Sequence, residues 1–313
     1  MKRTIVMVIL LVFLLVGCRG FSRHEEGDVN YRRGTQGLEL RLLDRSPPFV
    51  VYEGDYLPIG IEFFNRGASE IFYGEYYITG YDPSIIRNYD PLYPGNLNAL
   101  PSYPYFFDML DKKTQFNREG GYMIKEHSSG RINLPIGTDK YRIPLTVYAC
   151  YDYETILNTE ICMDPEPHRP PGDKACITRN PAVGGGQAAP VAITNVDLTN
   201  MRNNMRITFT ISNVGSGTIV DLDRMLNFNA CPTGFGPADV DVVYLDEVLV
   251  GGPGSPAVDC SPSGRVKLVN GIGRVSCTVP IPSGTAYTTP LDIRLEYGYR
   301  THVRREVEIR GFS

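Results

Sequence analysis

Hydrophobic and polar residues alternate at period two in two stretches of this chain that resemble each other. Residues 59–67 read IGIEFFNRG and residues 207–215 read ITFTISNVG, so each run ends in Asn-x-Gly. Alternation at period two places the apolar side chains on one face of a strand. An Asn-x-Gly end permits a sharp turn, because Asn and Gly tolerate positive φ. We therefore predict two equivalent strands, 148 residues apart.

A second pair of similar segments follows at nearly the same spacing. Residues 144–153 read PLTVYACYDY and residues 290–299 read PLDIRLEYGY, an offset of 146. One face of each predicted strand carries only apolar or tyrosine side chains: Leu145, Val147, Ala149, Tyr151 and Tyr153 in the first, and Leu291, Ile293, Leu295, Tyr297 and Tyr299 in the second.

A last strand is predicted at the end of each half, over 157–161 and 303–309. Matched segments in the same order indicate an internal duplication. Short alternating strands between turn residues are typical of sandwiches. We predict an all-β fold with two tandem immunoglobulin-like antiparallel β-sandwiches, over 37–178 and 191–313, joined by a linker over 179–190.

Residues 1–18 have the features of an export signal. Two basic residues precede a 12-residue apolar run, as in secretory signals, and a membrane span would need roughly 20 residues. The run ends in Leu-Val-Gly-Cys18, which resembles the lipobox of prokaryotic lipoproteins and implies a lipid on Cys18. Simple cleavage and a retained anchor are the alternatives. Residues 19–36 are polar and are expected to form a flexible tether, so we predict a protein exported to the outer face of the cell membrane or the cell surface.

Six cysteines remain after Cys18, and an even number in an exported chain favours disulfides, with 15 connectivities possible. Cys162 and Cys176 flank a proline-rich stretch and are expected to pair. Cys260 and Cys277 flank an Asn-Gly hairpin signal and form the second expected pair.

Cys150 and Cys231 are left over, either bridged between the two halves or free, and a Cys150–Cys162 bridge across the last hairpin is a rival. Cys150, Cys162, His168 and Cys176 also compose a Cys₃His set that could bind zinc. The spacings are long and irregular, and an oxidising compartment competes for the thiols. We therefore expect no metal and no cofactor.

Composition and motifs narrow the function. The 313 residues are 42% hydrophobic and 21% charged, with a net charge of −4, which argues against a nucleic-acid partner. The sequence contains no zinc-protease, nucleophile-elbow or phosphate-loop motif. Asp239 and Asp241 alternate with apolar residues, so we expect them on a solvated face. No catalytic residue is predicted, and an enzyme is not expected.

An insertion over 81–107 is rich in tyrosine and proline and has no regular period. Tyrosine offers rigid, amphipathic contact area, which binding surfaces use. The rings could instead pack back against the sandwich edge, or the segment could be disordered. If the chain has a specific site, we expect it in the first of the two predicted sandwiches, with these candidate residues from the insertion: Tyr81, Tyr89, Tyr93, Tyr103, Tyr105 and Phe106.

Glu53-Gly54-Asp55 before the first alternating strand and Asn65-Arg66-Gly67 after it resemble the immunoglobulin-like repeats of prokaryotic surface proteins, the CARDB type. The whole chain is similar to small secreted lipoproteins of archaeal type. The resemblance implies the fold and a surface location, and it carries over no catalytic residue.

These observations predict a non-enzymatic, lipid-anchored surface protein for adhesion, assembly or envelope structure. Its expected partner is an envelope or extracellular protein or glycan, and the membrane is reached through the lipid on Cys18. One alternative is a solute- or glycan-binding lipoprotein that uses the Tyr-rich loop. Another is an exported hydrolase or zinc protein.

Overall fold

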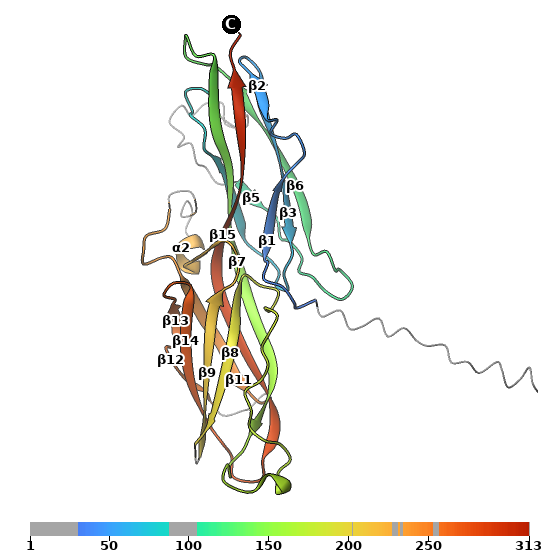
Figure 1. The fold of residues 1–313 in the computed structure, drawn as a ribbon, viewed down its shortest axis with the longest axis vertical. Coiled ribbons are helices and arrows are strands. Elements are labelled where there is room, and N and C mark those ends of the chain that lie inside the picture. Colours follow the sequence, from blue (N-terminus) through green and yellow to red (C-terminus); the bar gives the residue numbers. More distant parts are fainter. Residues whose placement is uncertain are drawn as a thin grey trace, which may run out of the picture. The chain divides into compact units, whose positions relative to one another are not determined.

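The computed structural model describes residues 31–87, 105–201, 203–226, 231, 234–252 and 257–312. Tyr31–Ser313 form one compact unit, and its described residues confirm the predicted all-β fold, with several antiparallel sheets (Figure 1). The predicted signal, Cys18 and the first part of the tether lie outside the described residues and stay predictions.

The strands form one large sheet and two smaller sheets. The first small sheet has the order β1-β3-β6, made of Leu38–Leu42, Tyr56–Asn65 and Tyr122–Arg131. The second has the order β12-β14-β9-β8, made of Asp259–Ser261, Ile272–Pro280, Asn204–Asn213 and Val191–Asn200. Strands β3 and β9 are the two that begin the predicted repeat.

The large sheet has the order β13-β11-β15-β7-β4-β5, made of Gly264–Lys267, Val242–Val250, Tyr287–Arg310, Lys140–Met163, Gly74–Thr79 and Tyr105–Phe107. Strands β10 (Thr218–Val220) and β2 (Val50–Tyr52) also pair with β15, β2 in parallel. Helix α2 spans Leu222–Leu226, and a short 3₁₀ turn spans Pro171–Asp173.

Strands β7 and β15 are each 24 residues long and pair antiparallel over their whole lengths, from Lys140 opposite Arg310 to Met163 opposite Tyr287 (Figure 1). The first half of β7 and the last half of β15 lie in lobe 1, which we define as the sandwich closed by β1, β3 and β6. The last half of β7 and the first half of β15 lie in lobe 2, closed by β8, β9, β12 and β14. Each half of the chain therefore contributes a strand to both lobes.

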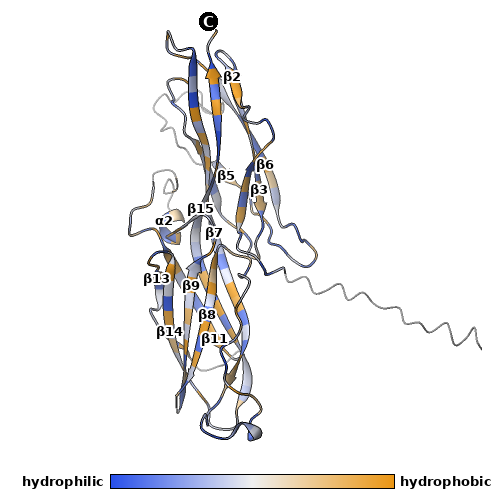
Figure 2. Ribbon diagram, in the orientation of Figure 1, coloured by the Kyte–Doolittle hydropathy of each residue, from blue (hydrophilic) through white to orange (hydrophobic). Residues whose placement is uncertain are grey.

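This strand exchange was not predicted. The segments expected as separate last strands, 157–161 and 303–309, are instead continuations of β7 and β15. The sequence between the predicted strands explains why: Glu154-Thr155-Ile156 and Arg300-Thr301-His302 contain no Gly or Pro to turn the chain. Figure 2 shows hydrophobic and polar residues alternating along several strands, β15 among them.

Four buried tyrosines mark the point where the strands pass from one lobe to the other, which we call the crossing. Tyr151 lies opposite Tyr299, and Tyr153 lies opposite Tyr297. The ring centroids of these pairs are 5.9 Å and 6.2 Å apart. Burial raises the pKa of all four hydroxyls, that of Tyr299 to about 12.

The two motifs that recur in the sequence contact each other, once in each lobe. The hydroxyl of Tyr153 donates to Asn65 Oδ1 at 3.3 Å, and that of Tyr299 donates to Asn213 Oδ1 at 3.1 Å. The glycine of each Asn-x-Gly motif is required, because a Cβ at Gly67 or Gly215 would collide with the same hydroxyl. The repeated side chains thus fix the ends of β3 and β9 to the crossing.

The expected linker and tether pack near the crossing. Ala188 is fully buried, and its carbonyl accepts the N–H of Ala68 at 2.9 Å. The Gly34 N–H donates to the carbonyl of Gly185, also at 2.9 Å. The described end of the segment expected to be a flexible tether is therefore hydrogen-bonded to the segment expected to be the linker.

Candidate binding surfaces

Half of the predicted partner-binding residues lie within the described chain. Tyr89, Tyr93 and Tyr103 lie outside it and stay predictions. Tyr81 is partly buried against the core, and burial raises the pKa of its hydroxyl. Phe106 on β5 is 49% exposed.

Tyr105 faces the interior of lobe 1. Its ring stacks on Tyr76 with centroids 5.2 Å apart and lies 4.4 Å from the ring of His127. The hydroxyl of Tyr76 is 2.7 Å from Nε2 of His127. Tyr105 and Tyr81 thus pack at the base of the insertion, and Phe106 offers the larger exposed surface of the three.

All six cysteines after Cys18 are paired. The disulfides Cys162–Cys176 and Cys260–Cys277 are the two expected pairs. Cys150–Cys231 joins the two halves of the chain, which was one of the alternatives left open. Three disulfides are typical of proteins that fold outside the reducing cytosol.

The pairing corrects two alternatives. Cys150–Cys162 cannot form because each cysteine has another partner. The Cys₃His set with His168 has no free thiol, because Cys150, Cys162 and Cys176 all belong to disulfides, and zinc binds the deprotonated thiolate. Those four residues are therefore not a zinc site in this structure.

A buried carboxyl group lies beside the disulfide that joins the halves. Glu75 on β4 is fully buried, and its carboxylate accepts the N–H of Cys231 and the hydroxyl of Tyr73, both at 3.3 Å. Burial raises the pKa of Glu75, and these two donors partly oppose the shift. Around it a small apolar cluster includes Tyr77, Val220 and Met225.

A cavity of about 210 Å³ opens on the outer face of the large sheet at the crossing. We call it the crossing cavity. Strands β7 and β15, helix α2 and the chain between β3 and β4 form its lining: Ser69, Glu70, Phe72, Asp152, Tyr153, Glu154, Leu222, Leu226 and Glu296. The sequence alone did not reveal these residues, because they come from four segments and share no motif.

Carboxyl groups dominate the polar part of the crossing cavity. Glu154 and Glu296 lie directly opposite each other on β7 and β15. Burial raises the pKa of Glu296, and the nearby carboxylates of Asp246 and Glu154 raise it further. Burial also raises the pKa of Asp152, although N–H groups of Tyr73 and Phe72 donate to it at 2.9 and 3.0 Å.

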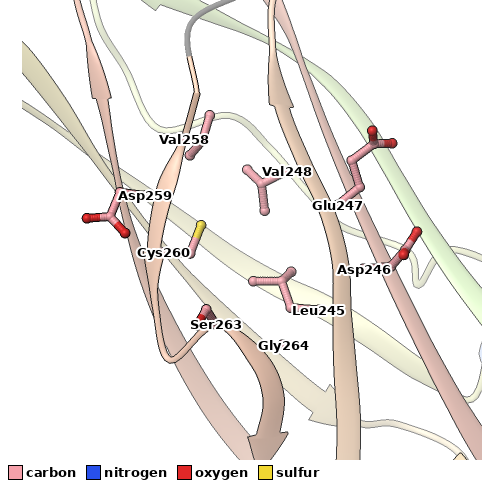
Figure 3. Close-up of a pocket in the computed structure, with 9 residues that line it drawn as sticks. All are labelled: Leu245, Asp246, Glu247, Val248, Val258, Asp259, Cys260, Ser263 and Gly264. Carbon is pink, nitrogen blue, oxygen red and sulfur yellow. The ribbon is translucent and has the colours of Figure 1, made fainter.

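A second cavity, of about 290 Å³, lies in lobe 2 between β11 and the turn from β12 to β13 (Figure 3). Leu245, Val248 and Val258 point toward one another there, with Cys260 beside them, whereas the carboxylates of Asp246 and Glu247 point away (Figure 3). The accessible part of its lining is mainly polar, but the carboxylates of Asp246 and Glu247 lie on the side opposite to that of Asp259 (Figure 3), so the described lining residues bring no set of polar groups together.

Among the described residues, no helix is both long enough and apolar enough to cross a membrane. Asp239 and Asp241, expected on the solvated face of a strand, lie before the start of β11 and are both partly exposed. Asp239 accepts the N–H of Gly236 at 3.1 Å, and Asp241 has a positive φ of 53° in a loop before β11. Asp221 is buried and is held by Arg265 at 3.1 Å.

Comparison with known proteins does not assign this chain to a family. No family model matches the sequence, and no curated protein matches it. Among solved structures, the CupB6 tip adhesin from Pseudomonas aeruginosa aligns over 90% of this chain and 97% of its own, with 11% identity and a TM-score of 0.17. Similarity at that level carries no argument about fold or function.

Proposed function

We propose that this chain is an exported, lipid-anchored surface protein that is not an enzyme and acts by binding. It would serve adhesion, assembly or envelope structure by presenting a stiff body to an envelope or extracellular protein or glycan. The anchor would be a lipid on Cys18. The signal-like pattern of residues 1–18 and the three disulfides both support export.

The continuous pairing of β7 with β15 is the observation that carries this proposal. Twenty-four consecutive residue pairs join the lobes, and the Cys150–Cys231 disulfide adds a covalent link between the halves. A hinge between the lobes would have to break this ladder. Such a body suits a protein that holds binding surfaces in a fixed geometry, whereas an enzyme that closes on its substrate needs mobile segments.

Lipid anchoring and export are tested together in intact cells. Cells expressing the wild type and Cys18→Ser are fed a radiolabelled fatty acid, and intact cells are treated with an externally added protease. We expect label on the wild type alone and digestion from outside. Label on both proteins, or full protection from the protease, would contradict the proposal.

Binding is tested by chemical cross-linking on intact cells, followed by mass spectrometry. We expect the wild type to be cross-linked reproducibly to an envelope or extracellular protein. A glycan array probed with the purified protein covers the glycan-binding alternative, in which Phe106→Ala, at the exposed candidate residue, would abolish binding. Substrate turnover by the purified protein would replace this proposal with the hydrolase alternative.

A further inference from the structure

The crossing cavity combines apolar walls with an acidic floor. Phe72 and Leu226 on its walls are 65% and 45% exposed, whereas the neighbouring Met225 of the same helix is fully buried. Glu154 and Glu296 lie on the floor, from adjacent strands. Apolar side chains that stay exposed around a cavity are a common feature of interaction sites.

The charges around this cavity are not balanced within the described part of the protein. Besides burial, the carboxylates of Asp246, Glu154 and Asp152 raise the pKa of Glu296, and the guanidinium of Arg294 is the cation that opposes them. Nε of Arg294 lies 3.7 Å from Glu154 and 3.9 Å from Asp246. Among the residues that the structure describes, the carboxylate of Glu296 makes no side-chain hydrogen bond or ion pair, and Arg294 attracts it only at longer range.

The facing glutamates are unfavourable for the sheet itself. Like charges directly opposite each other on an antiparallel pair destabilise it, and Glu154 and Glu296 occupy such positions. Departures from the locally favourable residue are expected where a protein binds something. A positively charged group entering the cavity would turn this repulsion into two attractions.

The opposite side of the crossing has no such deficit among its described residues. There Arg300 lies over the rings of Tyr148 and Phe235, 5.6 Å and 5.8 Å from their centroids. Cys231 covers Glu75 and donates its N–H to it. On that side the buried charges are therefore satisfied by the protein's own groups, whereas the crossing cavity faces solvent.

We propose that the crossing cavity binds an arginine or lysine side chain presented by a protein partner. The aliphatic stem packs against Leu226 and Phe72, and the cationic head lies between the carboxylates of Glu154 and Glu296. Arginine fits best, because its planar guanidinium can stack on a phenyl ring and bond two carboxylates at once. This inference rests on the proposed function, since it gives the binding protein a site and its partner a chemistry.

A divalent cation fits the cavity less well. Calcium takes six to eight oxygen ligands, whereas Phe72, Leu222 and Leu226 contribute none to the lining. The aliphatic part of an arginine or lysine uses such walls, because these side chains bury their stems while keeping the charge near polar groups.

The test uses two short peptides that differ in one side chain. Acetyl-Gly-Leu-Arg-Leu-Gly-amide and its citrulline counterpart have nearly the same shape, but only the first is charged. Each is titrated into the purified protein at low salt, and binding is followed by the methyl NMR signals of Leu222 and Leu226. We expect saturable binding of the arginine peptide and about tenfold weaker binding of the citrulline peptide.

Variants locate the binding. Glu296→Gln removes the unpaired charge and is expected to weaken the arginine peptide about fivefold or more, and Phe72→Ala is expected to weaken both peptides. Asp259→Asn is the matched control, because Asp259 lines the other cavity, and it should change neither. Equal binding of the two peptides, no binding, or no effect of Glu296→Gln would overturn the proposal.

Two further outcomes are informative. Displacement of the arginine peptide by one equivalent of Ca²⁺ would make this a metal site and overturn the proposal. If Glu296→Gln cells retain the cross-linked partner at wild-type yield, the cavity proposal fails while the proposed function stands. If wild-type cells yield no partner although the peptide binds, the proposed function fails instead.

Discussion

The two sides of the crossing, both on the outer face of the same sheet, are built differently. On the lobe 1 side, the connection from β10 to β11 covers the sheet, with α2 and the Cys150–Cys231 disulfide closing over Glu75. On the lobe 2 side, the sheet stays open at Glu154 and Glu296. The same sheet is thus covered on one side of the crossing and accessible on the other, and the proposed binding site lies on the accessible side.

Removal of the Cys150–Cys231 disulfide, which closes over the covered side of the sheet, has the largest expected effect on stability. The double variant Cys150→Ala/Cys231→Ala opens a loop of 81 residues, which is expected to cost about 4.5 kcal/mol in the chain-entropy model. Cys162→Ala/Cys176→Ala opens only 14 residues and is expected to cost about 3 kcal/mol. Urea unfolding measures both. A smaller loss of unfolding free energy for Cys150→Ala/Cys231→Ala would contradict the view that this disulfide constrains the two halves of the chain.

Substitution of the repeated glycines compares the lobes. A Cβ at Gly67 would meet the Tyr153 hydroxyl and the carbonyls of Ala188 and Gln36, whereas at Gly215 it would first meet side-chain atoms of Tyr299 and Pro190, with the backbone Cα of Pro190 farther away at 3.2 Å. Backbone cannot move aside as easily as side chains. Gly67→Ala is therefore expected to cost about 3 kcal/mol and Gly215→Ala less.

Thermal unfolding ranks Gly67→Ala and Gly215→Ala by the decrease in melting temperature that each causes. Gly184→Ala is the control, because a Cβ at Gly184 would meet no described atom within 4 Å, and it should leave the melting temperature unchanged. Equal effects at Gly67 and Gly215 would show that the two motif contacts are equally adaptable.

Ionisation of Glu75, on the covered side, has a smaller expected effect on stability, and this effect depends on pH. Burial raises the pKa of Glu75 in the folded state above its ordinary value of 4.5. The folded protein therefore holds this proton more tightly than the unfolded chain does, and stability falls as the pH rises from about 4.5 through the folded-state pKa. Glu75→Gln keeps the acceptor for Cys231 but cannot ionise.

The melting temperature of Glu75→Gln should exceed that of the wild type by about 2 °C at pH 8, and the difference should vanish at pH 4. Calorimetry at several pH values measures this. A Glu75→Gln protein that is less stable at pH 8 would mean that the ionised carboxylate stabilises the cover. Glu296→Gln is the matching variant on the open side and should show a weaker dependence, because solvent reaches that group.

Periodicity predicted which side chains face the core but not which strands would pair. The faces of β3, β9, β7 and β15 follow from alternation at period two, and two disulfides follow from loop positions in the sequence. Whether the chain turns after Tyr153 or continues depends on a partner strand nearly 150 residues away, which local pattern does not encode. The crossing cavity was missed for the same reason, since Glu154 and Glu296 become neighbours only through this pairing.

The most direct measurement tests the exchange of strands itself. Arg142 and Glu308 lie opposite each other on β7 and β15 and form an ion pair at 3.0 Å. The variant Arg142→Cys/Glu308→Cys should form a new disulfide under mild oxidation, seen by peptide mapping, whereas Arg142→Cys/Asp292→Cys should not. Absence of the 142–308 bridge, or a bridge in the control, would mean that the two halves do not share their strands.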